Sequence, residues 1–494
     1  MELTTTRELF RAIAPQDWTR DSIVRRRALV THLIMPCEHW WDVQGAVAVC
    51  PPPDALFPNL RHLTIIARSP YDDRGVHPGF LDLILGPNIG ATSTSSTITA
   101  LHLLGVRASH VPDPRGLIAR CPALTDIRID HAPEDIADAD DVGFAYAILD
   151  AVPKRYRHLT SLSLSLCGDF TSTQLSALSQ MRGLRSLALF NSRRPSGAQP
   201  RPPPMQLSSN GDEFRSLQAL KLFYFYHEDV LAIIHCVRGR ALERISLHIR
   251  VPSAAAFAAL MEAIGAHCDP PTLRVCRMHF IGGNMHELAW GVSRAHLKQL
   301  SAFPNLTDVV LEKIPSSELV DEDVAVLVGC WPALRSLVVT TRFRWPDEAR
   351  LTLNALIAIA RHCPDIERVK IRLDALVVPH AALVVPQAAL VAPLGKVVVL
   401  PKGSMEHSEA GSSSRLGARS PLCMGARPPL CTGTRPPLRL AVDRAPIDDA
   451  DAVAQILQRL FPGIQDVKYR EVFDAPHGWK THWDRVNALL LAAR

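Results

Sequence analysis

The stretch CPALTDIRI, residues 121–129, contains the pattern that decides the fold. Its apolar residues Leu124, Ile127 and Ile129 are separated first by two variable residues and then by one. This apolar triplet, called the phrase below, returns along most of the chain. Twelve copies occur, at Leu60/Leu63/Ile65, Ile98/Leu101/Leu103, Leu124/Ile127/Ile129, Leu159/Leu162/Leu164, Leu184/Leu187/Leu189, Leu217/Leu220/Leu222, Leu242/Ile245/Leu247, Leu273/Cys276/Met278, Leu306/Val309/Leu311, Leu334/Leu337/Val339, Ile366/Val369/Ile371 and Ile464/Val467/Tyr469.

The spacing of the copies predicts a repeat protein. The first eleven begin about 31 residues apart on average. This exceeds the about 20–29 residues usual for a leucine-rich repeat and leaves room for a helix in each repeat. The last two apolar residues of a phrase alternate, so on a strand they point to one face. Between the phrases, apolar residues three and four apart predict helices over Val142–Val152, Leu175–Met181, Val230–Val237, Ala254–Ile264, Val324–Val328 and Leu351–Ala360.

Proline marks the turns from helix to strand. It occurs in RCPAL at 120–124, CWPAL at 330–334 and HCPDI at 362–366, where it ends a helix and favours an extended lead-in to the strand. One strand–helix unit cannot bury its apolar side alone, but stacked units share a continuous core. We therefore predict an α/β leucine-rich-repeat solenoid (horseshoe). An ordinary α/β sheet is the alternative, because any alternation of strands and helices gives some matches to the phrase.

The pattern divides the chain into four parts. Residues 1–56 are predicted to be an N-terminal helical cap, with a helix over Trp18–Met35 that shields the first repeat. Residues 57–375 form the solenoid, and residues 441–494 supply a closing repeat and a C-terminal helix. Between them, residues 376–440 are low-complexity sequence rich in Pro, Ala, Val and Gly, which predicts a disordered insertion.

The insertion contains short tandem repeats of its own, one of period seven and one of period eight. Leu376–Leu394 has no formal charge and is long enough for a membrane span. Its regularly spaced prolines and the lack of aromatic flanks argue against a span, so we expect no membrane contact. The evenly spaced Arg419, Arg427 and Arg435 are interpreted as part of a solvated linker.

The composition of the chain limits which partners and which cellular compartment we expect. The 54 Lys and Arg residues against 49 Asp and Glu leave a net charge of +5 over 494 residues, so we do not expect nucleic acid as a partner. The 11 cysteines form no CxxC pair, and Met1–Phe10 contains no apolar signal segment. We therefore expect an intracellular protein, cytoplasmic or nuclear.

No catalytic or cofactor-binding motif is recognisable, so we expect no enzyme activity, no cofactor and no metal. His286 and Glu287 begin a zinc-protease pattern, but its second histidine would stand at Trp290. Carboxylates at helix starts satisfy free backbone N–H groups, so we interpret three acidic clusters as helix caps, with metal binding as the alternative. The clusters are residues 138–141, 321–323 and 448–451.

The middle residue between the last two apolar positions of each phrase should face away from the core, on the concave side of the sheet. These residues are Thr64, His102, Arg128, Ser163, Ala188, Lys221, Ser246, Arg277, Val310, Val338 and Lys370. Such a face suits a protein partner with an acidic region, and Val310 and Val338 would add an apolar edge. A solvated face with no partner is the alternative. The candidate partner-binding residues are His102, Arg128, Lys221, Arg277 and Lys370.

Four segments carry a family resemblance: CPALTDIRI (121–129), CWPALRSLVV (330–339), FPNLRHLTI (57–65) and FPNLTDVVL (303–311). They resemble the repeats of leucine-rich-repeat F-box proteins, and the chain is most similar to the F-box-like proteins of mushroom-forming fungi. The C-terminal AVAQILQRLFPGIQDV resembles the closing repeat of that set.

The resemblance implies a substrate receptor of an SCF-type (cullin-RING) ubiquitin ligase, whose F-box docks the ligase adaptor. Residues 1–56 do not match the Leu-Pro-x-Glu helix that opens this module. We therefore expect a protein-interaction scaffold with an unknown partner. The alternative is a ligase substrate-recognition subunit with a degenerate or missing F-box, which would add the adaptor as a partner. A hydrolase or transferase is disfavoured, because no constellation of residues supports one.

Overall fold

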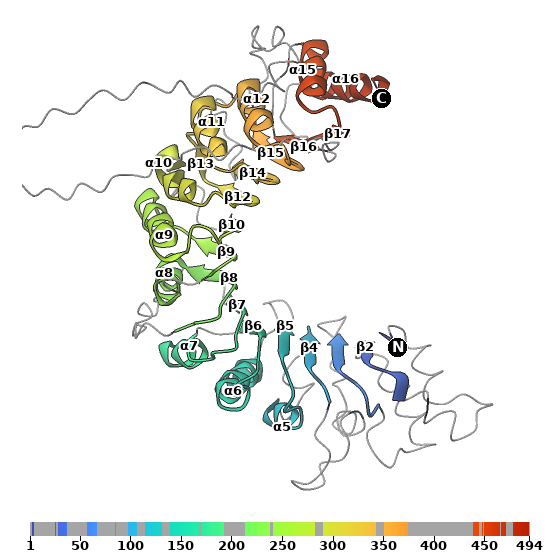
Figure 1. Cartoon of the computed structure of the whole chain (residues 1–494), viewed down its shortest axis with the longest axis vertical. Helices are drawn as coiled ribbons and strands as arrows, with labels where there is room; N and C mark the ends of the chain where they lie inside the picture. The colour runs from blue at the N-terminus through green and yellow to red at the C-terminus, as the bar shows by residue number, and fades with distance from the viewer. Residues whose placement is uncertain are drawn as a thin grey trace, which may run out of the picture. The chain divides into compact units, whose positions relative to one another are not determined.

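The structure is a computed structural model of the chain (Figure 1). Its described part is mixed α/β with parallel strands, and it divides into two compact units. Unit 1 comprises Met1–Val292 with Val310–Ser316, and unit 2 comprises Ser293–Val309 with Ser317–Arg494. The structure describes residues 2–3, 25, 28–36, 57–66, 84, 97–105, 114–130, 139–166, 170–191, 213–237, 241–281, 290–341, 350–373, 438–443, 447, 449–464, 466–470 and 478–493.

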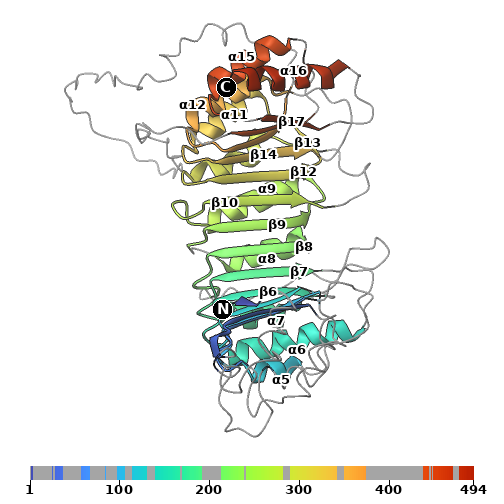
Figure 2. The same ribbon diagram turned by 90° about the vertical axis from the view of Figure 1, so that its right-hand side faces the viewer.

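Unit 1 contains a parallel sheet in which the strands follow one another in chain order (Figure 2). A two-stranded sheet of β11 (Gly291–Val292) and β13 (Ser316–Ser317) accompanies it. The strands of the long sheet are β1 (Glu2–Leu3), β2 (His32–Pro36), β3 (His62–Ile66), β4 (Ala100–Leu104), β5 (Asp126–Asp130), β6 (Ser161–Leu166), β7 (Ser186–Asn191), β8 (Ala219–Tyr226), β9 (Arg244–Arg250), β10 (Val275–Phe280) and β12 (Asp308–Ile314), the last from Val310 onward.

The helices of unit 1 lie on one side of its sheet (Figure 1). Local sequence starts them: Thr171 and Gln174 form a reciprocal capping box at α7, and the Ser253 hydroxyl accepts from the Ala256 N–H at α9. The apolar side of each helix then faces the sheet, and a residue on it such as Phe257 is fully buried. The helices are α5 (Pro114–Ala119), α6 (Ala139–Arg155), α7 (Ser172–Ser179), α8 (His227–Cys236) and α9 (Ala254–His267).

Unit 2 repeats this arrangement on a smaller scale. Its parallel strands are β14 (Ser336–Thr341), β15 (Arg368–Arg372), β16 (Arg439–Asp443) and β17 (Asp466–Arg470), again in chain order. Its helices are α10 (Arg294–Leu297), the 3₁₀ helix η4 (Lys298–Ala302), α11 (Asp321–Gly329), α12 (Leu353–His362), α15 (Ala450–Leu460) and α16 (Gly478–Ala492). Each of the six helices predicted from the sequence coincides in large part with a helix of the structure, in α6, α7, α8, α9, α11 and α12.

The phrases supply the core of both units. In the eleven copies from Leu60 to Ile371, the last two apolar residues lie on a strand and the first lies just before it. All three are buried in every one of these copies, none more than 6% exposed. Strand register stacks equivalent positions, as where Leu187 pairs with Leu162 on one side and Leu220 on the other. Each fully buried leucine contributes about 1.5–3 kcal/mol.

The same backbone hydrogen bonds recur at the start of successive strands. The N–H groups of Thr125 and Asp126 both donate to the Thr99 carbonyl, at 2.8 and 3.1 Å, and those of Thr160 and Ser161 donate to the Thr125 carbonyl. In unit 1 this two-donor pattern continues from the Thr31 carbonyl to the Glu243 carbonyl, and in unit 2 it is found at the Thr307 and Arg335 carbonyls. These contacts fix one register along each sheet.

The turn before each phrase is also regular. The Leu124 N–H donates to the Cys121 carbonyl at 3.3 Å, and the same bond joins Leu334 to Trp331 and Ile366 to Cys363. The residue that supplies the carbonyl is buried in each case. Trp331 also donates from its indole Nε1 to the Leu300 carbonyl, at 2.9 Å. The three predicted proline turns are therefore confirmed as turns that anchor a large or sulfur-containing side chain in the core.

The edge strand β17 is closed by helix α16. The Asn487 amide oxygen accepts from the Val467 N–H at 2.9 Å, and its amide nitrogen donates to the Val467 carbonyl at 3.0 Å. The Asn487 amide thus makes the two hydrogen bonds that a neighbouring strand would make to Val467. Because these backbone groups are occupied, this part of the edge is less able to pair with another chain.

The predicted capping helix over Trp18–Met35 is wrong at its C-terminal end. Arg25, Ala28 and Leu29 are helical, but His32–Pro36 is strand β2, paired in parallel with β3. Val30, Leu33 and Met35 are buried and form a further copy of the phrase. The helical prediction was wrong here because this short apolar segment fits both a helix and a strand until its neighbours are known.

The predicted insertion ends earlier than residue 440. Arg439 and Leu440 lie in β16, which pairs with β15 in register, and Leu438 beside it is 1% exposed. The sequence pattern missed this strand because Pro437 stands where the first apolar residue of the phrase is expected. Residues 374–437 lie outside the described part, and so do the tandem repeats and the Leu376–Leu394 segment. Among the described helices, none has the length and apolar character needed to cross a membrane.

Candidate protein-binding face

The helix-distal face of unit 1 is the side of its sheet opposite helices α5–α9 (Figure 1). On each strand, a buried residue alternates with one that belongs to this face; Leu101 and Leu103 are fully buried, whereas His102 between them is partly exposed. Register places the middle residues of successive phrases opposite one another, in what we call the middle row. The row contains Thr64, His102, Arg128, Ser163, Ala188, Lys221, Ser246 and Arg277.

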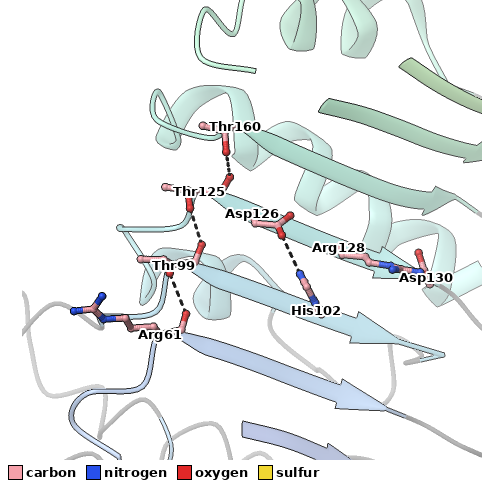
Figure 3. A network of polar contacts seen from close by, with 8 residues as sticks. All are labelled: Arg61, Thr99, His102, Thr125, Asp126, Arg128, Asp130 and Thr160. Atoms are coloured by element: carbon pink, nitrogen blue, oxygen red, sulfur yellow. Dashed lines mark hydrogen bonds and ion pairs between the residues drawn. The ribbon is translucent and has the colours of Figure 1, made fainter. Parts of the chain in front are cut away.

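The candidate residues His102 and Arg128 each have a carboxylate partner within the chain (Figure 3). His102 Nε2 lies 3.1 Å from Asp126 Oδ2. Nε and Nη2 of Arg128 both donate to Asp130 Oδ2, at 2.9 and 2.6 Å. Arg128 is thus exposed but already paired within the chain, because residues two apart on a strand share a face and Asp130 lies beside it. Its role in partner binding stays a prediction.

Asp126 is held as a carboxylate by its neighbours. Burial alone would raise its pKa, but hydrogen bonds from His102 and Ser161, together with the nearby charges of His102 and His62, lower the pKa below its usual range. At the N-terminal end of the face, the charged side chains of His102, Asp126, Arg128 and Asp130 are thus paired with one another.

The remaining candidates differ in exposure. Lys221 and Arg277 are exposed in the middle row, and Lys370, on β15 of unit 2, is half-buried. Val310 and Val338 are only 7% and 2% exposed. The predicted apolar edge at these two valines is therefore wrong, because both are buried and offer almost no surface to a partner.

A ladder of threonines joins the strand starts of β4, β5 and β6 (Figure 3). The hydroxyls of Thr99, Thr125 and Thr160 donate to the carbonyls of Arg61, Thr99 and Thr125, at 3.2, 3.2 and 3.0 Å. Each hydroxyl therefore reaches the equivalent position of the preceding strand. The ladder fixes register and is a structural element rather than a binding one.

A stacked histidine pair lies on the same face, on β2 and β3. The rings of His32 and His62 have centroids 4.1 Å apart and are inclined by 8°. Burial, followed by the nearby His32 and His102, lowers the pKa of His62 below its ordinary value. His62 therefore favours its neutral form near pH 7.

The main aromatic feature of the face is a second row, the aromatic row, formed by Phe190, Phe223, His248 and His279 on β7 to β10. Successive ring centroids lie 4.0, 4.3 and 4.7 Å apart, with interplanar angles of 5°, 46° and 15°. At its end, His279 Nδ1 lies 3.3 Å from Glu312 Oε2 on β12. Rings that cover one another's faces leave their edges for other contacts, and those edges carry partial positive charge.

A β-bulge keeps Phe223 in this row. Tyr224 has a positive φ of 66°, and the register between β8 and β9 shifts across it, so that Phe223 pairs with His248 and Phe225 pairs with Ile249. Phe225 is 2% exposed and belongs to the core. The extra residue thus places Phe223 on the helix-distal face and Phe225 in the core, although they are only two residues apart.

His248 is neutral at physiological pH. Burial is the main cause, and the neighbouring His279 and Lys313 add to it while Glu312 opposes it; together they lower the pKa of His248 to about 4. The sequence contained a signal for this row that our reasoning missed. Its members directly follow the third apolar residue of their phrases, whereas we considered only the middle residue.

In the acidic clusters at 321–323 and 448–451, a carboxylate caps a helix; the side chains of the cluster at 138–141 lie outside the described part. Asp323 accepts from the Val320 N–H at α11, and Asp449 accepts from the Ala452 N–H at α15, at 3.3 and 2.9 Å. Asp321 accepts from both the N–H and the hydroxyl of Thr352. Residues 286 and 287 lie outside the described part, and no group of His, Cys, Asp or Glu within it is arranged to hold a metal ion.

Neither protein-family models nor curated proteins contain a match to this chain.

Proposed function

We propose that the chain is a leucine-rich-repeat protein that binds another protein through the helix-distal face of its sheet. The repeat assignment is supported by the phrase on successive strands, its burial, and the recurring pair of hydrogen bonds at each strand start.

The observation that carries the binding role is the composition of the middle row from β8 to β10. Lys221 and Arg277 are exposed there, and they lie on the strands of Phe223 and His279 in the aromatic row. Cations beside ring edges favour acceptor groups, so the partner should present carboxylates to this part of the face.

The test replaces both cations. Partners are first collected by affinity purification on the full chain from its native cell, and the wild type is then compared with the double variant Lys221→Glu/Arg277→Glu. We expect the captured partner to be lost or weakened at moderate salt, with the circular dichroism spectrum and melting temperature nearly unchanged.

The matched control is Arg182→Glu/Arg215→Glu. These exposed arginines lie in the turns before β7 and β8, outside both rows, and their reversal changes the net charge equally. The proposal predicts that the control keeps the partner. An identical partner list and affinity for the Lys221/Arg277 variant would place binding elsewhere.

A further inference from the structure

The helix-distal face of unit 2 contains an unbroken cationic strand. On β15, Val369 and Ile371 are buried, at 0% and 1% exposure, and Arg368, Lys370 and Arg372 alternate with them. Every position of this strand that points away from the core is therefore basic. Residues two apart on a strand are about 6.6 Å apart, so the three positions span about 13 Å in a line.

The neighbouring strands extend this basic patch, which we define as Arg368, Lys370, Arg439 and Lys468. Register places Arg439 of β16 beside Arg368. It also places Lys468 of β17 two strands from Lys370, with the small Ala441 between them. Arg368, Arg439 and Lys468 are exposed.

By register, the acidic residues of β16 and β17 stand in the rows on either side of the central row. Asp466 stands opposite Arg439, and Asp443 stands between Arg372 and Arg470. The central row contains Val338, Lys370, Ala441 and Lys468, with no acidic residue. The ion pair of Arg335 with Glu367, at 3.8 Å, lies in the turns before the strands. The register positions of this face on β15, β16 and β17 therefore hold six Lys or Arg residues and two Asp residues.

Arg368 has an internal contact that does not neutralise its charge. Arg368 Nε donates to the Ser336 hydroxyl at 2.8 Å. Serine is uncharged, so the guanidinium keeps its charge, and a carboxylate can still be bound through the terminal nitrogens.

We propose that this patch binds an extended acidic peptide segment of a protein partner, with carboxylates at every second residue, lying along β15. Alternate side chains of an extended peptide are spaced like alternate side chains of the strand, so carboxylates at that period meet Arg368 and Lys370 in turn. The inference rests on the proposed function and names the chemistry of the partner for unit 2.

A single-stranded nucleic acid is the less favoured occupant. Such strands are held by aromatic side chains on which bases stack, besides cations that follow the phosphates. The described positions of β14 and β15 on this face are Ser336, Val338, Thr340, Arg368, Lys370 and Arg372, none of them aromatic.

The experiment measures fluorescence anisotropy with the full chain and three labelled probes. The first is an octapeptide of alternating Glu and Ser, the second has the same composition with its four Glu in one block, and the third is an oligothymidylate of equal length. We expect the alternating peptide to bind tightest. Its affinity should fall at least about tenfold in Arg368→Glu/Lys370→Glu, and it should weaken with added salt.

The control reverses two exposed cations on helical segments of unit 2, Lys298→Glu/Arg361→Glu, and should bind the alternating peptide like the wild type. Equal binding of the two peptides, tighter binding of the oligothymidylate, or an unaffected Arg368/Lys370 variant would each overturn the inference. Melting curves check that both variants fold.

The outcome is separable from the proposed function. If Lys221→Glu/Arg277→Glu loses its captured partner but the wild type fails to bind the alternating peptide, the binding role stands and the assignment of acidic chemistry to β15 falls. If the peptide binds as expected but partner capture does not depend on Lys221 and Arg277, the binding role of unit 1 falls.

Discussion

Leu187 shows how one residue of a phrase ties three strands together. It is fully buried, and its register partners are Leu162 on β6 and Leu220 on β8. The sequence alone was enough to predict this position, because an apolar triplet with fixed spacing has one arrangement that buries all its members.

Truncating such a residue should create a cavity. We predict that Leu187→Ala or Leu220→Ala lowers the free energy of unfolding by about 2–5 kcal/mol, measured by urea denaturation. Lys221→Ala, next to Leu220 but on the opposite face, should change it by less than about 0.5 kcal/mol. An unchanged denaturation midpoint for either leucine variant would contradict the register.

A second prediction concerns His248, whose pKa is lowered to about 4 from an ordinary 6.5. The folded chain then binds fewer protons than the unfolded chain between these values, so stability falls as the pH drops through this window. Because the ring is partly exposed, solvent reduces the effect to on the order of 1–2 kcal/mol.

The measurement for His248 is the melting temperature of the wild type and of His248→Phe at pH 7.5 and pH 4. His279, Glu312 and Lys313 also face this ring, and they remain in the variant. We expect the variant to lose less stability on acidification than the wild type. Equal losses would mean that His248 is not the titrating group.

At the scale of elements, the prediction from sequence succeeded where the pattern was long and failed where it was short or interrupted. The helix around Phe257 and the turn at Cys121 followed from periodicity and proline placement. The strand at His32–Pro36 was predicted as helix because a five-residue segment fits the periodicity of either a helix or a strand. Strand β16 was missed because Pro437 stands where the first apolar residue of its phrase is expected. The ion pair of Arg128 with Asp130 was missed because we treated each middle residue alone.

The edge strand β17 offers an element-scale prediction. Asn487→Ala removes both hydrogen bonds to Val467 and leaves its N–H and carbonyl without that partner, so we expect a loss of about 1–3 kcal/mol. The exposed edge should also raise self-association, measured by sedimentation velocity. The control Arg485→Ala, also on α16, breaks an exposed ion pair with Asp451 of α15 and should cost under about 1 kcal/mol. Unaltered stability and sedimentation in Asn487→Ala would show that the amide does not protect the edge.

At the scale of the whole molecule, the chain divides its residues between two tasks. Apolar residues of the phrases build the core, and the residues alternating with them are left for the helix-distal face. Sequence could predict this division and the middle row, because both follow from the period of a strand. It could not predict which face residues pair with a neighbouring repeat, since that depends on a residue far along the chain, as for His279 and Glu312, which are 33 residues apart.

The most direct test of the binding role is site-specific photo-crosslinking in the native cell. A photoreactive phenylalanine analogue replaces either Lys221, in the middle row, or Arg215, in the turn before β8. The two positions are close in sequence but differ in whether they belong to the helix-distal face. We predict a discrete crosslinked protein from position 221 and none from position 215. A crosslink from position 215 alone, or none from position 221 while the partner is still captured, would contradict binding through this face.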